Sequence, residues 1–460
     1  MKKIKILTPI ALLSSVSLLA GCGNIKDKLH KLADYFYEVD TYTKLDYDYA
    51  DKFWADNNDN WGGGCSAVTK LLYDEDGNPH RVVGRNMDLN ISNKCAYVVR
   101  TNVEGGHKTV GLAYTFRDYS PDYVDVEKNG ISKHFYKILP FMCDDVLNDT
   151  GLHIEINMRH GEHYPNGDDM FSMEHSDPKN FKGKRRIHMF ELPRYIGENC
   201  TTVEEAKEYV KTLDIYSKYE YWNYCFLISD ATGAASLVEF NEIGLSEAFN
   251  ITTAKRVNWF DDNKEDLAKI DEYLTWGPAG AAQDIPINGL AHTNFYLNKY
   301  AWTLEDIKSG EGRFRTIQEN IGNVENKVDM FNLMDKISYH WFYESYDLCM
   351  NEHFDPRTEN VGEGPGLTYG VLFDPDPSLQ EYIKFYFNYY ALSVYQQYPT
   401  REDKQNVNKF WETTFCEVVD CMSKTIQVRI FEENSIYCNV GLDSTTVLDN
   451  EAAFRASLAW

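Results

Sequence analysis

The chain has 460 residues, a length that allows one large domain or a few smaller ones. Its 71 acidic residues outnumber 46 lysines and arginines, giving a formal net charge of −25. This balance argues against nucleic-acid binding, because phosphate contacts need concentrated Lys and Arg. Aromatic residues make up 14 % of the chain, which excludes a disordered protein.

The first 21 residues have the pattern of an export signal. Three lysines precede an apolar run (residues 6–18) that is too short to span a bilayer as a stable helix. The motif LAGC at residues 19–22 resembles a bacterial lipobox, in which the cysteine is diacylated and becomes the mature N-terminus. An ordinary secretory signal that ends near a cysteine is the alternative. We therefore predict a lipoprotein signal peptide over residues 1–21 and an exported protein tethered to the outer face of the cytoplasmic membrane only through Cys22.

Residues 22–64 are predicted to be a lipidated spacer or pro-segment. It ends in three glycines that lead directly into Cys65. Because glycines give little steric protection, the Gly64–Cys65 peptide bond is a candidate cleavage site. Cleavage would give Cys65 a free α-amine with a pKa of about 8, which can accept the thiol proton without a histidine. A structural cysteine after a flexible linker is the alternative interpretation.

The predicted elements are hairpins and capped helices. In chain order they are a hairpin at 66–83, a helix from the TVEE capping box at 202–205, a hairpin at 224–240, a helix at 328–343 and a strand pair at 407–434. This order favours an α+β layered domain over a parallel βαβ series. The Gly-, Pro- and Tyr-rich region 355–406 could be an insertion or part of the core.

The return strand of the first hairpin carries two charged residues next to the strand that begins with Cys65. It reads VVGRNMDL and contains Arg85 and Asp88. A guanidinium is permanently charged and lowers the pKa of a neighbouring thiol. A carboxylate can orient a terminal ammonium group through a charge-assisted hydrogen bond. This hairpin alone therefore predicts a nucleophile, its base, an activating charge and an orienting group.

The hairpin CSAVTKLLYDEDGNPHRVVGRNMDL resembles the first hairpin of the choloylglycine hydrolase family. These linear-amide hydrolases belong to the N-terminal nucleophile class and include bile salt hydrolases and penicillin V acylases. Further segments match in order, namely GLHIEINM, TTVEEAKEYVKTL, CFLISDATGAASLVEF, HTNFYLNKY and GRFR. The likeness is clear over residues 65–320 and weak in the final hairpin. It implies a four-layer αββα sandwich, with residues 65–460 as the amidase domain and an insertion near 355–406.

The resemblance also implies roles for individual residues. Cys65 Sγ attacks an amide carbonyl while its own α-amine takes and returns the proton, and Asp88 positions that amine. Arg85 and Arg313, the latter in GRFR, supply positive potential. Lipoprotein processing would cut before Cys22, so a second, autocatalytic cleavage before Cys65 is required, which resembles the processing of acid-ceramidase-type relatives. If the excised segment does not stay bound, this cleavage releases the enzyme from the membrane.

Two asparagines are implied to hold the developing oxyanion, through the backbone N–H of Asn157 and the side-chain amide of Asn294. An asparagine at 157 is more similar to bile salt hydrolases than to penicillin V acylases, which tend to carry tyrosine there. The loops expected to shape the acyl pocket, 114–143 and 158–190, follow neither subgroup.

We therefore expect an amidase acting on N-acyl amino acid conjugates, with conjugated bile salts favoured. A penicillin V acylase, an acyl-homoserine-lactone acylase or a fatty-acyl amide hydrolase is the alternative within the class. A non-catalytic, ligand-binding surface lipoprotein in which Cys65 stays uncut is the alternative outside it.

No cofactor and no metal site are predicted. His160, Glu162 and His163 lack a third ligand at a recognisable spacing and are expected to be loop residues. No two cysteines form a CxxC pair, and Cys225 and Cys416 lie in apolar runs that predict buried thiols. Disulfide pairing does not follow from the sequence. Self-association also remains open.

Overall fold

The structure is a computed structural model. It describes residues 24–25, 27–56, 63–90, 95–114, 130–160, 184–216, 222–241, 244–251, 289–293, 313, 316–317, 320–338, 411–430 and 435–460. Several predictions concern residues outside these ranges, namely the signal peptide 1–21, Cys22, Glu162, His163, Asn294 and the region 355–406. Within the described ranges, no helix is both long and apolar enough to cross a membrane.

Two large sheets form the centre of the molecule. The strands of the first are β2 (Leu29–Ala33), β3 (Phe36–Val39), β6 (Ala96–Thr101), β7 (Thr109–Tyr114), β9 (Asp145–Asn148), β10 (His153–His160), β13 (Trp222–Ser229), β14 (Ala235–Asn241) and β15 (Gly244–Ile251). Their order is β15-β14-β13-β10-β9-β7-β6-β3-β2. The strands of the second are β4 (Gly63–Tyr73), β5 (Pro79–Asn90), β16 (Gly289–His292), β17 (Trp411–Asp420), β18 (Thr425–Ile430), β19 (Ile436–Gly441) and β20 (Thr445–Leu448). Their order is β16-β4-β5-β17-β18-β19-β20.

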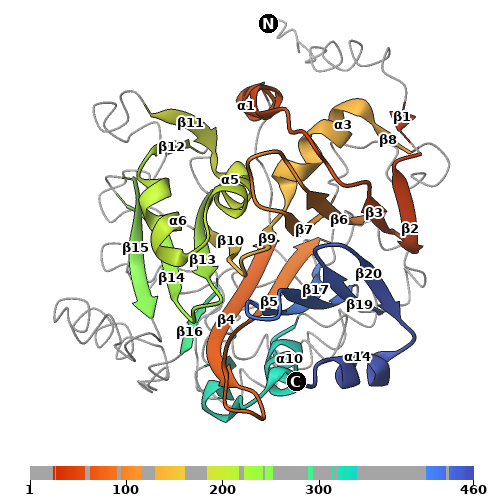
Figure 1. Cartoon of the computed structure of the whole chain (residues 1–460), viewed down its shortest axis with the longest axis vertical. Coiled ribbons are helices and arrows are strands. Elements are labelled where there is room, and N and C mark those ends of the chain that lie inside the picture. The colour runs from red at the N-terminus through yellow and green to blue at the C-terminus, as the bar shows by residue number, and fades with distance from the viewer. Residues whose placement is uncertain are drawn as a thin grey trace, which may run out of the picture.

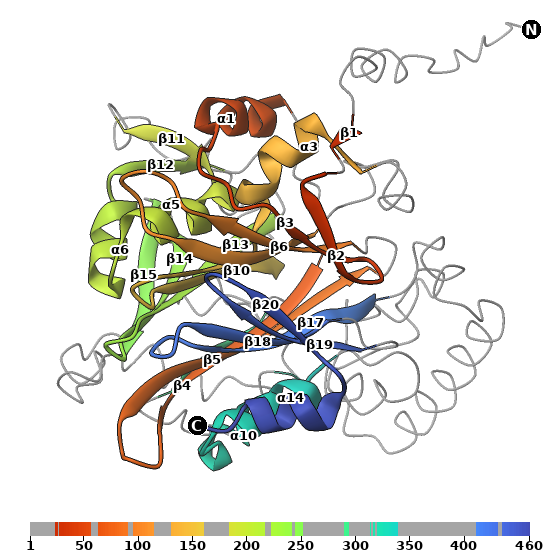
Figure 2. The same ribbon diagram turned by 45° about the vertical axis from the view of Figure 1, so that its right-hand side comes forward.

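Helices cover the outer face of each sheet. Over the first sheet lie α1 (Tyr47–Asp56), α3 (Lys133–Ile138), α5 (Leu192–Asn199) and α6 (Val203–Val210), and over the second lie α10 (Lys327–Lys336) and α14 (Glu451–Ser457). Figure 1 and Figure 2 show the two sheets stacked between these helix layers. The predicted α+β class and the four-layer αββα arrangement are therefore confirmed.

Smaller elements complete the described chain. They are the strand pairs β1 (Asn24–Ile25) with β8 (Ile131–Ser132) and β11 (Arg185–His188) with β12 (Leu213–Tyr216), and the short helical turns η4 (Leu139–Met142), η5 (Met189–Glu191) and η8 (Ile321–Asn323).

The elements predicted from local pattern are present. β4 and β5 form the first hairpin, β13 and β14 the second, and β17 and β18 the last. The capping box begins α6, where Thr202 accepts a hydrogen bond from the Glu205 N–H at 3.2 Å. Glu205 returns the contact to the N–H of Thr201 at 2.8 Å instead of to that of Thr202. His160 is the last residue of β10, so the expectation that it lies in a loop is wrong.

Close packing of β5 against α10 determines which way its side chains point. A Cβ atom on Gly84 would lie 2.7 Å from Met334 Cγ and 2.8 Å from Met330 Sδ, so a larger residue would force these methionine side chains to move. Because strand side chains alternate between faces, the next residue, Arg85, points away from α10 and into the space between the two sheets. The Arg85 guanidinium meets the carbonyl of Ile156 on β10 there, at 2.8 Å.

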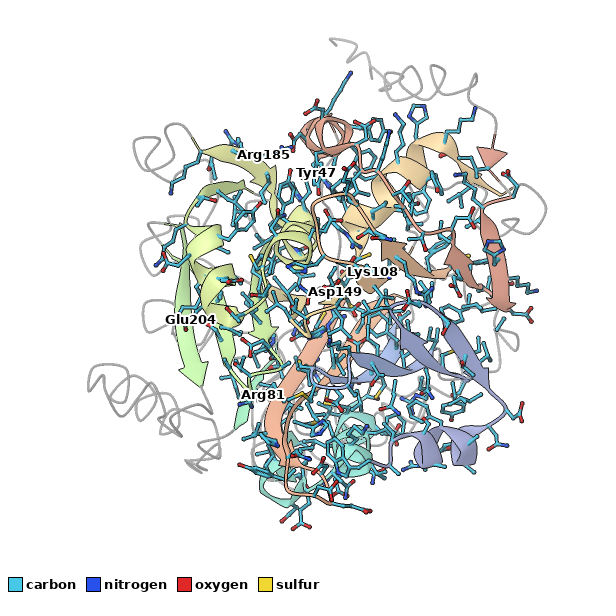
Figure 3. The ribbon with its side chains drawn as sticks, in the orientation of Figure 1. Tyr47, Arg81, Lys108, Asp149, Arg185 and Glu204 are labelled. Atoms are coloured by element: carbon cyan, nitrogen blue, oxygen red, sulfur yellow. The ribbon has the colours of Figure 1, made fainter. Side chains whose placement is uncertain are left out.

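The N-terminal segment 24–56 is built into the fold. β3 pairs in parallel with β6 and thereby extends the first sheet. α1 packs on α3 and β11, and Trp54 from α1 is completely buried and stacks on His188 at 4.6 Å between ring centroids. Arg185 from β11 lies over the Tyr47 ring of α1 at 5.4 Å (Figure 3). These contacts tie the segment to the main fold, and its removal as a pro-segment stays a prediction.

Candidate active site

Cys65 is buried near the beginning of β4 on the face that points toward the first sheet. In the β4–β5 ladder it lies opposite Met87, and its Sγ is 3.3 Å from Met87 Sδ. Two residues further along, Ala67 lies opposite Arg85. Because residues two apart on a strand share a face, the Cys65 and Arg85 side chains point the same way. The sequence prediction that one hairpin brings these two residues together is consistent with this register.

Asp88 lies on the other face of the same hairpin, directly opposite Gly64. Its carboxylate is completely buried and accepts a hydrogen bond from the Thr413 hydroxyl at 2.6 Å. Its other oxygen contacts Arg313 Nη1 at 3.0 Å. The carboxylate therefore lies at the level of the Gly64–Cys65 peptide bond, where cleavage would create the α-amine.

Arg313 connects this carboxylate to the predicted nucleophile. Its Nη1 donates to the Cys65 carbonyl at 3.0 Å and to the Ser66 hydroxyl at 2.8 Å, in addition to Asp88. The guanidinium is nearly fully buried, so its charge is compensated by Asp88 and not by solvent. Ser66 and Thr413 are contacts that the sequence did not predict, because neither lies in a recognisable motif.

Arg85 is held by groups from both sheets. Its Nε lies 2.7 Å from Glu155 Oε2, and its Nη1 lies 3.7 Å from Glu417 Oε1. Burial lowers the pKa of the guanidinium, but Glu155 and Glu417 outweigh burial and raise it above the usual value, with a smaller contribution from the Cys65 thiol. Arg85 therefore stays charged between two carboxylates. The sequence did not single out Glu155 or Glu417, because they come from strands far away in the chain.

Asn157 lies on β10 opposite Cys225, and its side-chain amide contacts a buried histidine. Asn157 Nδ2 is 3.2 Å from His292 Nδ1, and His292 Nε2 is 3.0 Å from Glu155 Oε1. Asn157 Nδ2 also lies 3.0 Å from His292 Nε2, and Cys225 Sγ lies 3.3 Å from His292 Nδ1, so the imidazole is surrounded by groups from β10 and β13. His292 was not predicted as part of the site. The only sequence signal was its position two residues before Asn294.

The described residues thus bring together four of the six predicted site residues in direct contact or on one hairpin. These are Cys65, Arg85, Asp88 and Arg313. Asn157 joins them indirectly, since it follows Ile156, whose carbonyl accepts from Arg85. Asn294 lies outside the described residues, although His292 and Thr293, which precede it, lie at the end of β16 beside β4.

The resemblance to N-terminal nucleophile hydrolases predicted an αββα sandwich, and the described residues have this fold with Cys65 near the start of β4. Residues 65–252 match the sequence model of the family described as linear amide C-N hydrolases, choloylglycine hydrolase family. The matched segment begins at the predicted nucleophile, Cys65. The chain is accordingly a hydrolase acting on carbon–nitrogen bonds in linear amides.

Three solved structures are similar to this chain. A mutant of the conjugated bile acid hydrolase from Clostridium perfringens has a TM-score of 0.41 and 12 % identity, over 84 % of this chain and 97 % of that chain. A second variant of the same hydrolase has a TM-score of 0.34 and 14 % identity, with the same coverage. Penicillin V acylase from Agrobacterium tumefaciens has a TM-score of 0.29 and 13 % identity, over 83 % of this chain and 84 % of that chain. No curated protein matches the chain.

Proposed function

We propose that this protein is an exported, lipid-anchored amidase that cleaves N-acyl amino acid conjugates after the Gly64–Cys65 bond has been cut. Conjugated bile salts are the favoured substrates. The observation that carries the proposal is the position of Gly64 opposite Asp88, with Arg313 joining that carboxylate to the carbonyl of Cys65. The family match of the segment that begins at Cys65 adds to it.

The mechanism follows from a cysteine that carries its own base. After cleavage, Cys65 Sγ attacks the amide carbonyl and its proton passes to the α-amine, which Asp88 holds in place. The carbonyl oxygen becomes an oxyanion, held by the Asn157 N–H and the Asn294 amide. Removing one such donor costs about 3 kcal/mol of transition-state stabilisation. The α-ammonium then gives the proton to the leaving amine, which departs and leaves a thioester.

Water completes the reaction. The α-amine of Cys65 takes a proton from the attacking water, the thioester bond breaks, and the thiol is regenerated as the acyl group leaves as a carboxylic acid. Arg85 interacts electrostatically with the Cys65 thiol, and a nearby guanidinium favours the thiolate over the thiol. No other side chain is needed as the base, which fits the amine-activated arrangement.

We further propose that the segment 24–56 stays bound after the cut and keeps the enzyme on its lipid anchor at Cys22. Support comes from the parallel pairing of β3 with β6 and from the buried side chain of Trp54. A cleaved segment that pairs as a strand of a sheet and fills part of the core behaves as a non-covalently bound subunit.

A substrate panel tests the proposed activity. Purified protein and its Cys65→Ala variant are each incubated with glycine and taurine bile conjugates, penicillin V, an acyl-homoserine lactone and fatty-acyl amino acids, and products are followed by mass spectrometry. We expect release of the amino acid from bile conjugates by the wild type and no turnover by the variant. Turnover of penicillin V or acyl amides alone would select another member of the class. No turnover of any substrate, with Cys65 uncut, would support the non-catalytic lipoprotein.

A further inference from the structure

The space between the two sheets holds a cluster of buried ionisable groups next to Arg85. Asp145 on β9, His153 on β10 and Glu417 on β17 are completely buried. One ligand atom from each lies within 4.8 Å of the other two. Two of these residues come from the first sheet and one from the second, so the cluster bridges the two layers.

The side chains of this cluster lack the hydrogen bonds that buried polar groups normally make. Among the described residues, neither ring nitrogen of His153 has a hydrogen-bond partner. The same is true of both carboxylate oxygens of Glu417 and of Oδ2 of Asp145. His153 Nε2 lies 4.0 Å from Asp145 Oδ2, too far for a hydrogen bond. The Leu112 N–H donates to Asp145 Oδ1 at 3.1 Å, which fixes that carboxylate and leaves its other oxygen facing the cluster.

Charge balance distinguishes this cluster from the neighbouring ion pair. Arg85 is paired closely with Glu155 at 2.7 Å, whereas its contact to Glu417 is 3.7 Å. Two buried guanidiniums, Arg85 and Arg194, act on this cluster, against four buried carboxyl groups, namely Asp144, Asp145, Glu155 and Glu417, so two carboxyl groups remain uncompensated. Asp145 also lies directly opposite Glu155 in the β9–β10 register, where like charges repel. A divalent cation would neutralise this excess.

We infer that Asp145, His153 and Glu417 bind a divalent transition-metal ion, Zn²⁺, that fastens the two sheets together. One imidazole nitrogen with two carboxylate oxygens suits zinc, which takes nitrogen and oxygen ligands at about 2.0–2.2 Å. Calcium and magnesium are disfavoured, because they take oxygen ligands at higher coordination number or retain several waters. A small inward movement of the three side chains brings them to bonding distance, and a water or a second carboxylate oxygen completes four-fold coordination.

Burial changes the protonation of all three side chains. Burial, with a smaller contribution from Arg85, lowers the pKa of His153 to about 3, so its ring is in the neutral form that binds metals. Burial raises the pKa of Asp145 to about 6, and burial together with Asp145 raises that of Glu417 well above its usual range. Each of these carboxyl groups is therefore either protonated or bound to a cation. Replacement by Asn or Gln mimics a protonated acid and preserves stability, whereas it removes a ligand from a metal site and lowers stability.

The test compares the full-length wild type with Asp145→Asn and Glu417→Gln variants. Protein produced in zinc-supplemented medium is dialysed and its metal content measured by mass spectrometry, and thermal unfolding is followed with and without chelator. Glu191→Gln is the matched control, because Glu191 is also buried and lies outside the cluster. We expect about one zinc per wild-type and control chain and at least a tenfold lower content in both cluster variants. We also expect chelator to lower the midpoint of the wild type and added Zn²⁺ to restore it.

Three outcomes would overturn the assignment. Zinc-free wild type whose unfolding midpoint is unmoved by Zn²⁺ would exclude the site, and this measurement needs no variant to fold. Cluster variants as stable as the wild type would show that the carboxyls are protonated, since asparagine and glutamine mimic the neutral acids. Zinc content that is equal in all four proteins would mean adventitious binding to the acidic surface and would equally contradict the proposal.

Discussion

Replacing Trp54 with alanine tests whether the N-terminal segment is held by the core of the enzyme. The indole is completely buried, with ring-centroid distances of 4.6 Å to His188, 5.2 Å to Phe190 and 5.1 Å to Phe53. Truncating a buried tryptophan to alanine costs about 3–5 kcal/mol. Because about 1.4 kcal/mol is a factor of ten, the cleaved segment should dissociate about a hundredfold to a few thousandfold more readily.

Native mass spectrometry of the processed protein measures this effect. For the wild type we expect the segment and the body of the enzyme to remain together through size-exclusion chromatography. For Trp54→Ala we expect the segment to be lost on dilution. Lys52→Ala is the control, because Lys52 is exposed on the same helix and exposed substitutions usually change stability by less than about 0.5 kcal/mol. A wild-type segment that leaves on cleavage, or a Trp54→Ala segment retained as tightly as the wild type, would refute the reasoning.

Three further predictions concern the predicted site and the buried thiols. Arg313→Ala should lower kcat/KM about a hundredfold in a substrate assay, because it removes the Nη1 group that contacts the Cys65 carbonyl, Ser66 and Asp88; an unchanged kcat/KM would exclude this role. Asp88→Asn removes one charge of the buried ion pair with Arg313 and should lower the free energy of unfolding in urea by about 3–5 kcal/mol, whereas a loss below about 1 kcal/mol would contradict it. Burial raises the pKa of the Cys143 and Cys438 thiols to about 12, so both stay protonated at neutral pH and should escape iodoacetamide in the native protein. Rapid labelling of either thiol, read by peptide mass spectrometry, would be inconsistent with that burial.

Elements with a local signal could be predicted from the sequence. The turn Asp230–Gly233 places Gly233 at a φ of 92°, and the strands on either side pair as expected. The TVEE capping box marks the start of α6, because a helix cap is determined by residues three positions apart in the sequence. A comparable signal was available for α14, where Asn450 accepts from the Ala453 N–H at 3.0 Å, but no helix was predicted there.

Contacts between distant parts of the chain could not be predicted in this way. Glu155 and Glu417 reach Arg85 from strands that are 70 or more residues away in the sequence, and no spacing rule connects such positions. β3 has only four residues, FYEV, which is too short for a recognisable strand pattern, and its parallel partner β6 lies beyond the first hairpin. Family resemblance supplied Arg313, whose three contacts follow only from the packed structure.

The mass of the active protein tests the central claim most directly. Intact-mass and N-terminal analysis of catalytically active, purified material should reveal a polypeptide that begins at Cys65, together with the retained segment that precedes it. Cys65→Ala should yield one uncut chain. Active material in which Gly64 is still joined to Cys65 by a peptide bond would contradict the account, because no free α-amine would then exist to take the proton from the sulfur.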